Sequence, residues 1–304
     1  MKKEYLIINS NCDDLPISLT IFTPEDSIKG IFQIAHGMAE HKERYYDFME
    51  YLANNGYIAV ISDHRGHGKS VLNKEDLGYF YEENAEYIVE DLHQITLYLK
   101  ELHPNKHVTL FGHSMGSMIV RKYIKKYDND VNKLIVCGSP SKNYLVDVAL
   151  WITKFMIDKK GDRYRSELLQ KLSVGNFNNK VKDNKKSTHA WLSTDKKVVQ
   201  KFDKDKLCGF TFTLNGFKNL FTLMKEIYDK NNWRLDNTNM PIFFIAGSDD
   251  PVINGKRNWM SSQKFLQKLG YKNVTGKLYE NLRHEILNEK NNKQVYEDII
   301  NFIK

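Results

Sequence analysis

The sequence predicts an α/β protein with an eight-stranded, mostly parallel sheet flanked by helices, and an inserted helical cap after the sixth strand. Three observations predict this class. From residue 30 onward, apolar strand-like runs alternate with amphipathic helical runs, as in parallel sheets with helical crossovers. The alternation stops at residues 138–140 (Gly-Ser-Pro) and resumes only at residue 241. A Gly-x-Ser-x-Gly run at residues 112–116 falls where a strand should meet a helix.

The first half of the chain gives its elements in a regular order. Two β-prone runs joined by a polar turn predict a hairpin at the start of the chain. Further apolar runs predict strands, and apolar residues at helical spacing predict the helices between them. The expected strands are residues 4–10, 16–22, 30–35, 57–61, 107–111 and 134–137, and the expected helices are residues 44–55, 85–103 and 115–127. The hairpin should therefore form an antiparallel edge of a parallel sheet.

The second half contains an interruption. Residues 141–235, here called the cap segment, include an apolar stretch (144–157), a polar stretch (176–186) and a charged stretch (196–205), without an obvious core strand. The strand–helix order then resumes with strands 241–246 and 274–279 and helices 258–269 and 293–303. The predicted organisation is a core of residues 1–140 and 236–304 with the cap segment inserted between its two parts.

Composition indicates a globular protein of one large domain. The chain has 304 residues, of which 41% are hydrophobic and 12% aromatic, enough for a sizeable core. No apolar stretch reaches transmembrane length, and residues 1–20 lack the segments of a signal peptide. Cys12, Cys137 and Cys208 are widely spaced, which indicates reduced thiols. We therefore expect a soluble, cytoplasmic protein.

The net charge of +7 is concentrated in the cap segment. It holds 20 Lys/Arg and 10 Asp/Glu, whereas the rest of the chain holds 25 and 28. No nucleic-acid-binding module is recognisable and Lys outnumbers Arg, so we expect no nucleic-acid partner. A solvated lysine-rich surface explains this charge, and transient contact with anionic membrane surfaces is the alternative. The sequence predicts no particular oligomeric state.

The Gly-His-Ser-Met-Gly run at residues 112–116 has the context of a nucleophile elbow. Its two glycines remove side chains where a strained turn brings strand and helix together. The turn should lift the hydroxyl of Ser114 clear of the sheet. The N–H of Met115 then lies at a helix N-terminus, where the dipole and free donors can hold an oxyanion.

A serine nucleophile needs a base and a carboxylate, which should follow on later strands. The loop at residues 247–251 (Gly-Ser-Asp-Asp-Pro) supplies acids, and the loop at residues 281–285 supplies His284, the only histidine beyond the seventh expected strand. We predict that His284 takes the proton of Ser114. Asp250 should fix the imidazole tautomer, with the adjacent Asp249 as the alternative acid.

The loop after the third strand, residues 36–38 (His-Gly-Met), should supply the second oxyanion donor. We assign this role to the backbone N–H of Met38, beside that of Met115. His36, Gly37 and His113 adjoin these groups and are assigned to substrate binding.

The sequence predicts no metal or cofactor. Residues 66–70 superficially resemble a phosphate loop, but the required first glycine is replaced by Asp63. His36, His41, His64 and His67 form no recognised metal-binding motif. Their expected roles are loop packing and pocket lining.

Several of these runs together resemble one family. The resemblance is carried by residues 36–41 (HGMAEH) with Arg44 and Tyr45, residues 63–70 (DHRGHGKS), residues 112–116 (GHSMG), residues 247–252 (GSDDPV), and His284 with Glu285. They resemble the monoacylglycerol lipase/lysophospholipase branch of the α/β-hydrolases, nearly end to end in the core. In the cap segment, residues 207–210 (LCGF) are similar to bacterial members.

The resemblance implies an α/β-hydrolase fold, a triad of Ser114, Asp250 and His284, and oxyanion donors at Met38 and Met115. It also implies hydrolysis of a single-acyl lipid ester without a cofactor. One departure is Met38, where many relatives carry a small residue. Its side chain should narrow the entrance on the acyl side.

The predicted activity is hydrolysis of a monoacylglycerol or lysophospholipid ester through an acyl-enzyme. Thioesters, small esters and N-terminal peptide bonds are alternative substrates for the same triad, and a non-catalytic binding protein is the alternative of another class. Epoxide hydrolases and dehalogenases would carry aspartate in place of Ser114. The apolar stretch 144–157 should either be buried against the core, the favoured interpretation, or line an acyl tunnel and meet a lipid interface.

Overall fold

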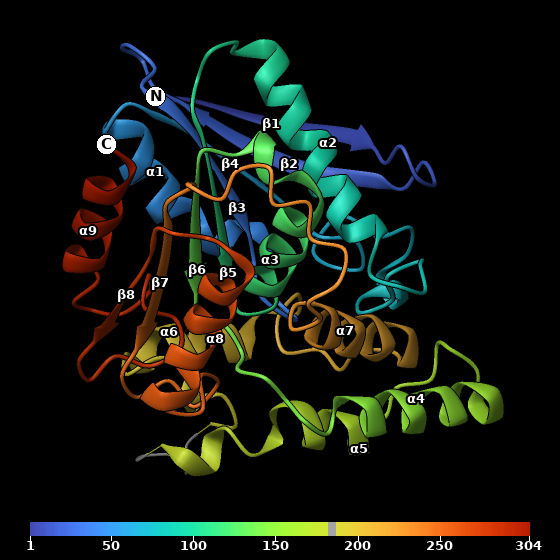
Figure 1. The fold of residues 1–304 in the computed structure, drawn as a ribbon. Coiled ribbons are helices and arrows are strands. Elements are labelled where there is room, and N and C mark those ends of the chain that lie inside the picture. Colours follow the sequence, from blue (N-terminus) through green and yellow to red (C-terminus); the bar gives the residue numbers. More distant parts are fainter. Residues whose placement is uncertain (182–186) are drawn as a thin grey trace.

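A computed structural model describes residues 1–181 and 187–304, which are organised around one eight-stranded sheet (Figure 1). Its strands are β1 (Lys2–Asn9), β2 (Pro16–Thr23), β3 (Gly30–Ala35), β4 (Tyr57–Ser62), β5 (Val108–His113), β6 (Lys133–Cys137), β7 (Ile242–Gly247) and β8 (Val274–Tyr279). They are ordered β1-β2-β4-β3-β5-β6-β7-β8. The β1–β2 and β2–β4 pairs are antiparallel and the remaining pairs are parallel. The predicted fold class is confirmed.

Helices cover both faces of the sheet (Figure 1). On one face, α1 and α9 contribute apolar side chains to a core around Phe32 and Phe111. On the other face, α2, α3 and α8 pack over Ile31 and Leu110. The bounds are α1 (Tyr46–Asn54), α2 (Tyr87–Leu102), α3 (Met115–Tyr127), α8 (Lys256–Leu269) and α9 (Lys293–Ile303). Adjacent residues of β3 and β5 thus enter opposite layers, as the pleat of a strand requires.

One helix begins later than its apolar pattern predicts. Residues Lys42–Tyr45 form a 3-10 turn, and α1 starts only at Tyr46. The N–H of Lys42 donates to a carboxylate oxygen of Asp63 at 2.9 Å. This bond ties the start of the turn to the loop after β4.

Residues 141–235 connect β6 to β7 through α4 (Val146–Lys160), α5 (Glu167–Gln170), α6 (Lys196–Lys204) and α7 (Leu214–Glu226). Figure 1 shows α4, α5 and α7 beyond one end of the sheet, far from both chain termini. Residues 182–186 of the cap segment lie outside the described residues. The division into core and cap remains a prediction.

The apolar stretch at α4 is not simply buried, so the favoured interpretation is wrong. Helix α4 packs against α7, but Trp151 and Phe155 are 68% and 54% exposed. Among the described residues, no helix is long and apolar enough to cross a membrane.

A buried ion cluster fixes the β1–β2 turn against the loop after β4 and α2. The fully buried guanidinium of Arg65 donates to Asp91 at 2.8 Å, to Asp13 at 3.0 Å and to the carbonyl of Phe80 at 3.0 Å. Removing one partner of a buried pair leaves the other charge uncompensated. The cluster should therefore contribute strongly to stability.

Replacing Arg65 with methionine should lower the free energy of unfolding by about 3–5 kcal/mol, because Asp91 would stay buried without its cation. Urea unfolding followed by circular dichroism measures this loss. Lys293→Met, which removes an exposed ion pair with Glu297, is the control and should cost less than about 1 kcal/mol. Equal losses in both variants would contradict the assignment.

Candidate active site

Ser114 occupies a strained turn between β5 and α3. Its φ is 54° and its ψ is −117°, a conformation that residues other than glycine rarely adopt. The backbone is crowded around it. A Cβ on Gly116 would lie 2.0 Å from the carbonyl oxygen of Ala35, and one on Gly112 would lie 2.3 Å from that of Gly116. The two glycines therefore allow the first turn of α3 to press against β3 and β5.

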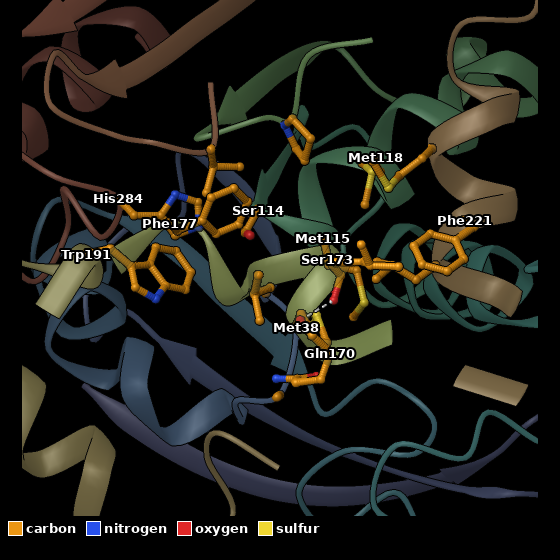
Figure 2. Close-up of a pocket in the computed structure, with 18 of the residues that line it drawn as sticks. Met38, Ser114, Met115, Met118, Gln170, Ser173, Phe177, Trp191, Phe221 and His284 are labelled. Atoms are coloured by element: carbon orange, nitrogen blue, oxygen red, sulfur yellow. Dashed lines mark hydrogen bonds between the residues drawn. The ribbon is translucent and has the colours of Figure 1, made fainter. Parts of the chain in front are cut away.

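His284 and Asp250 form a buried pair next to this turn. The Nδ1 atom of His284 and Oδ2 of Asp250 are 2.9 Å apart, and the other oxygen of Asp250 accepts the N–H of Val252 at 2.8 Å. Gly138, at the end of β6, leaves room for the pair, since a Cβ there would lie 3.0 Å from Cε1 of His284. Figure 2 shows His284 and Ser114 among the residues that line a pocket.

The carboxylate of Asp250 determines which nitrogen of the His284 ring carries the hydrogen. A carboxylate accepts, so Nδ1 of His284 carries a hydrogen, and in the neutral ring Nε2 then keeps its lone pair. Within the described residues, Nε2 has no hydrogen-bond partner and is buried. His284 is thus in the tautomer that a general base requires.

The alternative acid, Asp249, does not reach His284. Its side chain is exposed and accepts a hydrogen bond from the hydroxyl of Ser248 at 3.2 Å. Adjacent residues of this turn face different ways, and only Asp250 faces inward. The geometry therefore excludes Asp249 as the partner of His284.

The loop after β3, residues 36–41 (the oxyanion loop), runs beside Ser114. A Cβ on Gly37 would lie 3.2 Å from Cβ of Ser114. The N–H of Gly37 is taken by Glu40 at 2.6 Å, and the next residue, Met38, lines the pocket. Met115 is the first residue of α3, so its N–H has no acceptor within the helix. These positions keep Met38 and Met115 as the candidate oxyanion donors.

His36 does not line the pocket, and its assignment to substrate binding is wrong. Its ring is fully buried, with Nδ1 2.8 Å from the carbonyl oxygen of Gly37 and Nε2 accepting the N–H of His64 at 3.0 Å. Burial, together with the neighbouring His64 and His67, holds the pKa of His36 well below its usual range. The neutral ring joins the loops after β3 and β4.

Gly37 and His113 do line the pocket, as predicted for substrate-binding residues. Both ring nitrogens of His113, however, contact protein atoms: the hydroxyl of Tyr45 at 3.0 Å and the carbonyl oxygen of His284 at 3.2 Å. The polar atoms of His113 are therefore committed to the protein, and only its ring surface faces the cavity.

The pocket is a largely apolar cavity of about 380 Å³. Figure 2 shows Met118 and Phe221 extending to one side of Ser114 and Trp191 beside His284 on the other. The rings of Trp191 and His284 have centroids 5.1 Å apart. Apolar lining residues come from α3, α4, α6, α7 and the connecting segments: Met38, Ala39, Met115, Met118, Pro140, Leu145, Val148, Ala149, Ile152, Leu172, Val174, Phe177, Trp191, Leu192, Phe202, Leu220, Phe221, Met224 and Val252.

Sequence reasoning did not single out the lining residues Phe177, Trp191 and Phe221. For Phe221 a signal exists: Thr213 caps α7 by accepting the N–H of Gly216 at 3.1 Å, and apolar residues follow at helical spacing. Phe177 lies in a turn and Trp191 in a three-residue 3-10 helix, and neither gave such a signal.

One group of metal-ligating residue types exists within the described chain. The donor atoms of His41, Asp205 and Cys208 lie within 4.8 Å of one another. His41 and Asp205 already share a hydrogen bond of 2.9 Å. None of the three lines the cavity, and proton transfer between Ser114 and His284 needs no metal.

The sheet order and the strand–serine–helix turn define the fold of the α/β-hydrolases. Residues 26–291 match the family described as serine aminopeptidase, S33. The chain belongs to this family.

Several similar proteins carry the names of lipases, lysophospholipases or esterases. The chain is 24% identical to a monoacylglycerol lipase of Mycolicibacterium smegmatis over 93% of its own length and 91% of the relative's. It is also 24% identical to a probable lysophospholipase L2 of Haemophilus influenzae, over 90% and 82% of the two chains. A thermostable carboxyl esterase from Bacillus coagulans, solved in complex with glycerol, superposes with a TM-score of 0.91 at 26% identity, over 100% and 98%.

These findings confirm the resemblance to the monoacylglycerol lipase/lysophospholipase branch. They support a carboxylic ester hydrolase of the esterase or lipase type.

Asp250→Asn should reduce kcat by about 10⁴-fold, because an amide no longer selects the required tautomer of His284. Asp249→Asn is the matched control on the neighbouring residue and should stay within about twofold, since Asp249 is exposed. Hydrolysis of a p-nitrophenyl ester measures both. A large loss in Asp249→Asn alone would reverse the assignment.

Proposed function

We propose that the protein is a serine hydrolase that cleaves carboxylic esters of single-acyl lipids through an acyl-enzyme. The observation that carries this proposal is the cavity of about 380 Å³, which Ser114, His284, Met38 and Met115 line together with a wall of apolar side chains. An apolar cavity with a few polar groups at one place suits a long apolar ligand with one polar reactive bond.

The proposed reaction follows from the roles of three side chains. Nε2 of His284 takes the hydroxyl proton of Ser114 as its oxygen attacks the ester carbonyl carbon. The N–H groups of Met38 and Met115 would hold the oxyanion. His284 then gives the proton to the leaving alcohol, and Asp250 stabilises the imidazolium in between. His284 then deprotonates a water molecule, which attacks the acyl-Ser114 ester, and returns that proton to the leaving oxygen of Ser114 as the fatty acid is released.

The charges around the cavity favour a neutral head group. Among the described residues, no Lys or Arg lines the cavity. Its two carboxylates, Glu40 and Glu285, are both paired with Arg44. A phosphate entering here would lose hydration and find no lysine or arginine partner. We therefore favour a monoacylglycerol over a lysophospholipid, in keeping with the name of the mycobacterial relative.

Hydrolysis of p-nitrophenyl esters from acetyl to palmitoyl should peak at a medium or long acyl chain, since the cavity wall is apolar, and should be lost in Ser114→Ala. With the acyl chain fixed, kcat/KM for the monoacylglycerol should exceed that for the lysophosphatidylcholine at least about tenfold, or ~1.4 kcal/mol. A peak at acetyl would replace the lipase assignment by a small-ester esterase. Failure of a fluorophosphonate probe to label Ser114 in the folded protein would exclude a serine hydrolase.

We also propose that α4 contacts a lipid surface. The cavity is lined in part by Leu145, Val148 and Ile152, at the start of α4 and along it. Trp151 and Phe155 of the same helix are exposed. Apolar surface therefore continues from the protein exterior into the cavity. Exposed lysines surround it at positions 142, 154, 159 and 160, as expected for binding to anionic lipids.

The double substitution Trp151→Ser/Phe155→Ser should weaken binding to phosphatidylglycerol-containing vesicles at least about tenfold, because two amphipathic anchors are lost. Wild-type binding should also weaken steeply between 50 and 500 mM salt, as roughly 1 kcal/mol per lysine is screened. Leu97→Ser, an exposed leucine on α2, is the control for vesicle sedimentation. Binding that is absent or independent of salt would refute the proposal.

A further inference from the structure

His113, the residue before Ser114, is held between two acceptors. The hydroxyl of Tyr45 donates its only hydrogen to Oε1 of Glu40 at 2.8 Å. The Tyr45 oxygen therefore offers only lone pairs to Nδ1 of His113, 3.0 Å away. On the other side of the ring, Nε2 lies 3.2 Å from the backbone carbonyl oxygen of His284, which can only accept. Both nitrogens satisfy these contacts only when both carry hydrogen, as in an imidazolium.

The charges nearby favour the same protonation state. Arg44 bonds to Glu40 and, in a two-pronged contact at 2.7 and 2.6 Å, to Glu285. These three buried groups carry a net charge of −1, which a protonated His113 would cancel. Burial alone disfavours the charged ring, but the carboxylate of Glu40, 3.5 Å from Nδ1, and then the charge of Glu285 raise the pKa of His113 above its usual value.

The same cluster keeps Glu40 ionised. Burial opposes its charge, yet the positive charge of Arg44 and that of the nearby His113 hold the pKa of Glu40 well below its usual range. Ionised Glu40 in turn accepts the N–H of Gly37 in the oxyanion loop. One end of the cluster is thus fixed to that loop, and the other end is fixed to residues 284 and 285.

We propose that His113 is held as an imidazolium and acts as a positioning residue that fixes the backbone of His284 relative to the oxyanion loop. Two routes connect these parts around Ser114: Glu40 to Tyr45 to His113 to the carbonyl of His284, and Glu40 to Arg44 to Glu285. The effect of His113 on the rate of ester hydrolysis rests on the proposed function, whereas the protonation state of His113 does not.

The pH dependence follows from the groups that face His113. Glu40 approaches from the oxyanion loop, Tyr45 from the turn before α1, and His284 and Glu285 from the loop after β8; the ring of His284 lies 4.6 Å away, centroid to centroid. Because the pKa of His113 is raised, the positioning is complete below the usual pKa of histidine. It is lost as the pH rises through the raised pKa, when one ring nitrogen gives up its hydrogen and its contact.

The first test is the protonation state of the ring by ¹⁵N NMR of histidine side chains, with His113→Gln identifying the signals. At pH 7 both nitrogens of His113 should show the shift of a protonated nitrogen. A neutral ring with one N–H, in which Tyr45 donates to Nδ1 instead, would overturn the proposal. This test holds even if the protein hydrolyses no ester.

The second test is the pH profile of ester hydrolysis in Glu285→Gln, which removes one charge near His113 but can still bond to Arg44. The alkaline limb of kcat should move to lower pH by about one unit, with KM within twofold. Glu280→Gln, an exposed residue of the same loop, should leave the profile unchanged. His113→Gln should lower kcat on the order of 10- to 100-fold and abolish that limb.

An alkaline limb that is unchanged in Glu285→Gln would overturn the positioning role even if His113→Gln fails to fold. A wild-type protein without esterase activity would refute the proposed function instead, and the NMR result would still decide the state of His113.

Discussion

The structure depends on the close approach of α3 to the ends of β3 and β5. Gly116 lies so near the carbonyl of Ala35 that no side chain could be placed between them. This contact strains Ser114 and exposes it at the edge of the sheet. It also brings the first N–H groups of α3 next to the loop that leaves β3. One backbone contact therefore places Ser114, the predicted nucleophile, beside two candidate oxyanion donors that are far apart in sequence.

The order of the strands in the sheet brings together the predicted acid and base, Asp250 and His284. Strands β5, β6, β7 and β8 are successive neighbours and parallel, so their carboxyl ends meet at one edge. The loops after β7 and β8 carry Asp250 and His284 to that edge. Between them and Ser114 lies only the end of β6, where Gly138 leaves space for the imidazole. The strand order thus places Asp250 and His284 near Ser114, and the lack of a side chain at Gly138 leaves space for them.

Local patterns explain which parts were predictable. The bounds of α3, β3, β8 and α9 agree with the sequence prediction, because apolar periodicity and the flanking turns are local. Facing directions were not predictable: His36 faces another loop instead of the cavity, and only the folded turn separates Asp250 from Asp249. Phe177 and Trp191 reach the cavity wall only because of how the cap segment packs, and local sequence patterns do not predict that packing.

The placement of charge explains how an apolar cavity can adjoin such a polar site. Glu40 and Glu285 line the cavity, and both are paired with Arg44, while Glu40 also accepts a backbone N–H. If they were unpaired, burial of each would cost several kcal/mol and would draw water toward Ser114. Because Glu40 and Glu285 are paired with Arg44, they can orient the loops while the cavity wall stays suited to an acyl chain. By our proposal, the same arrangement makes the site depend on the protonation of His113.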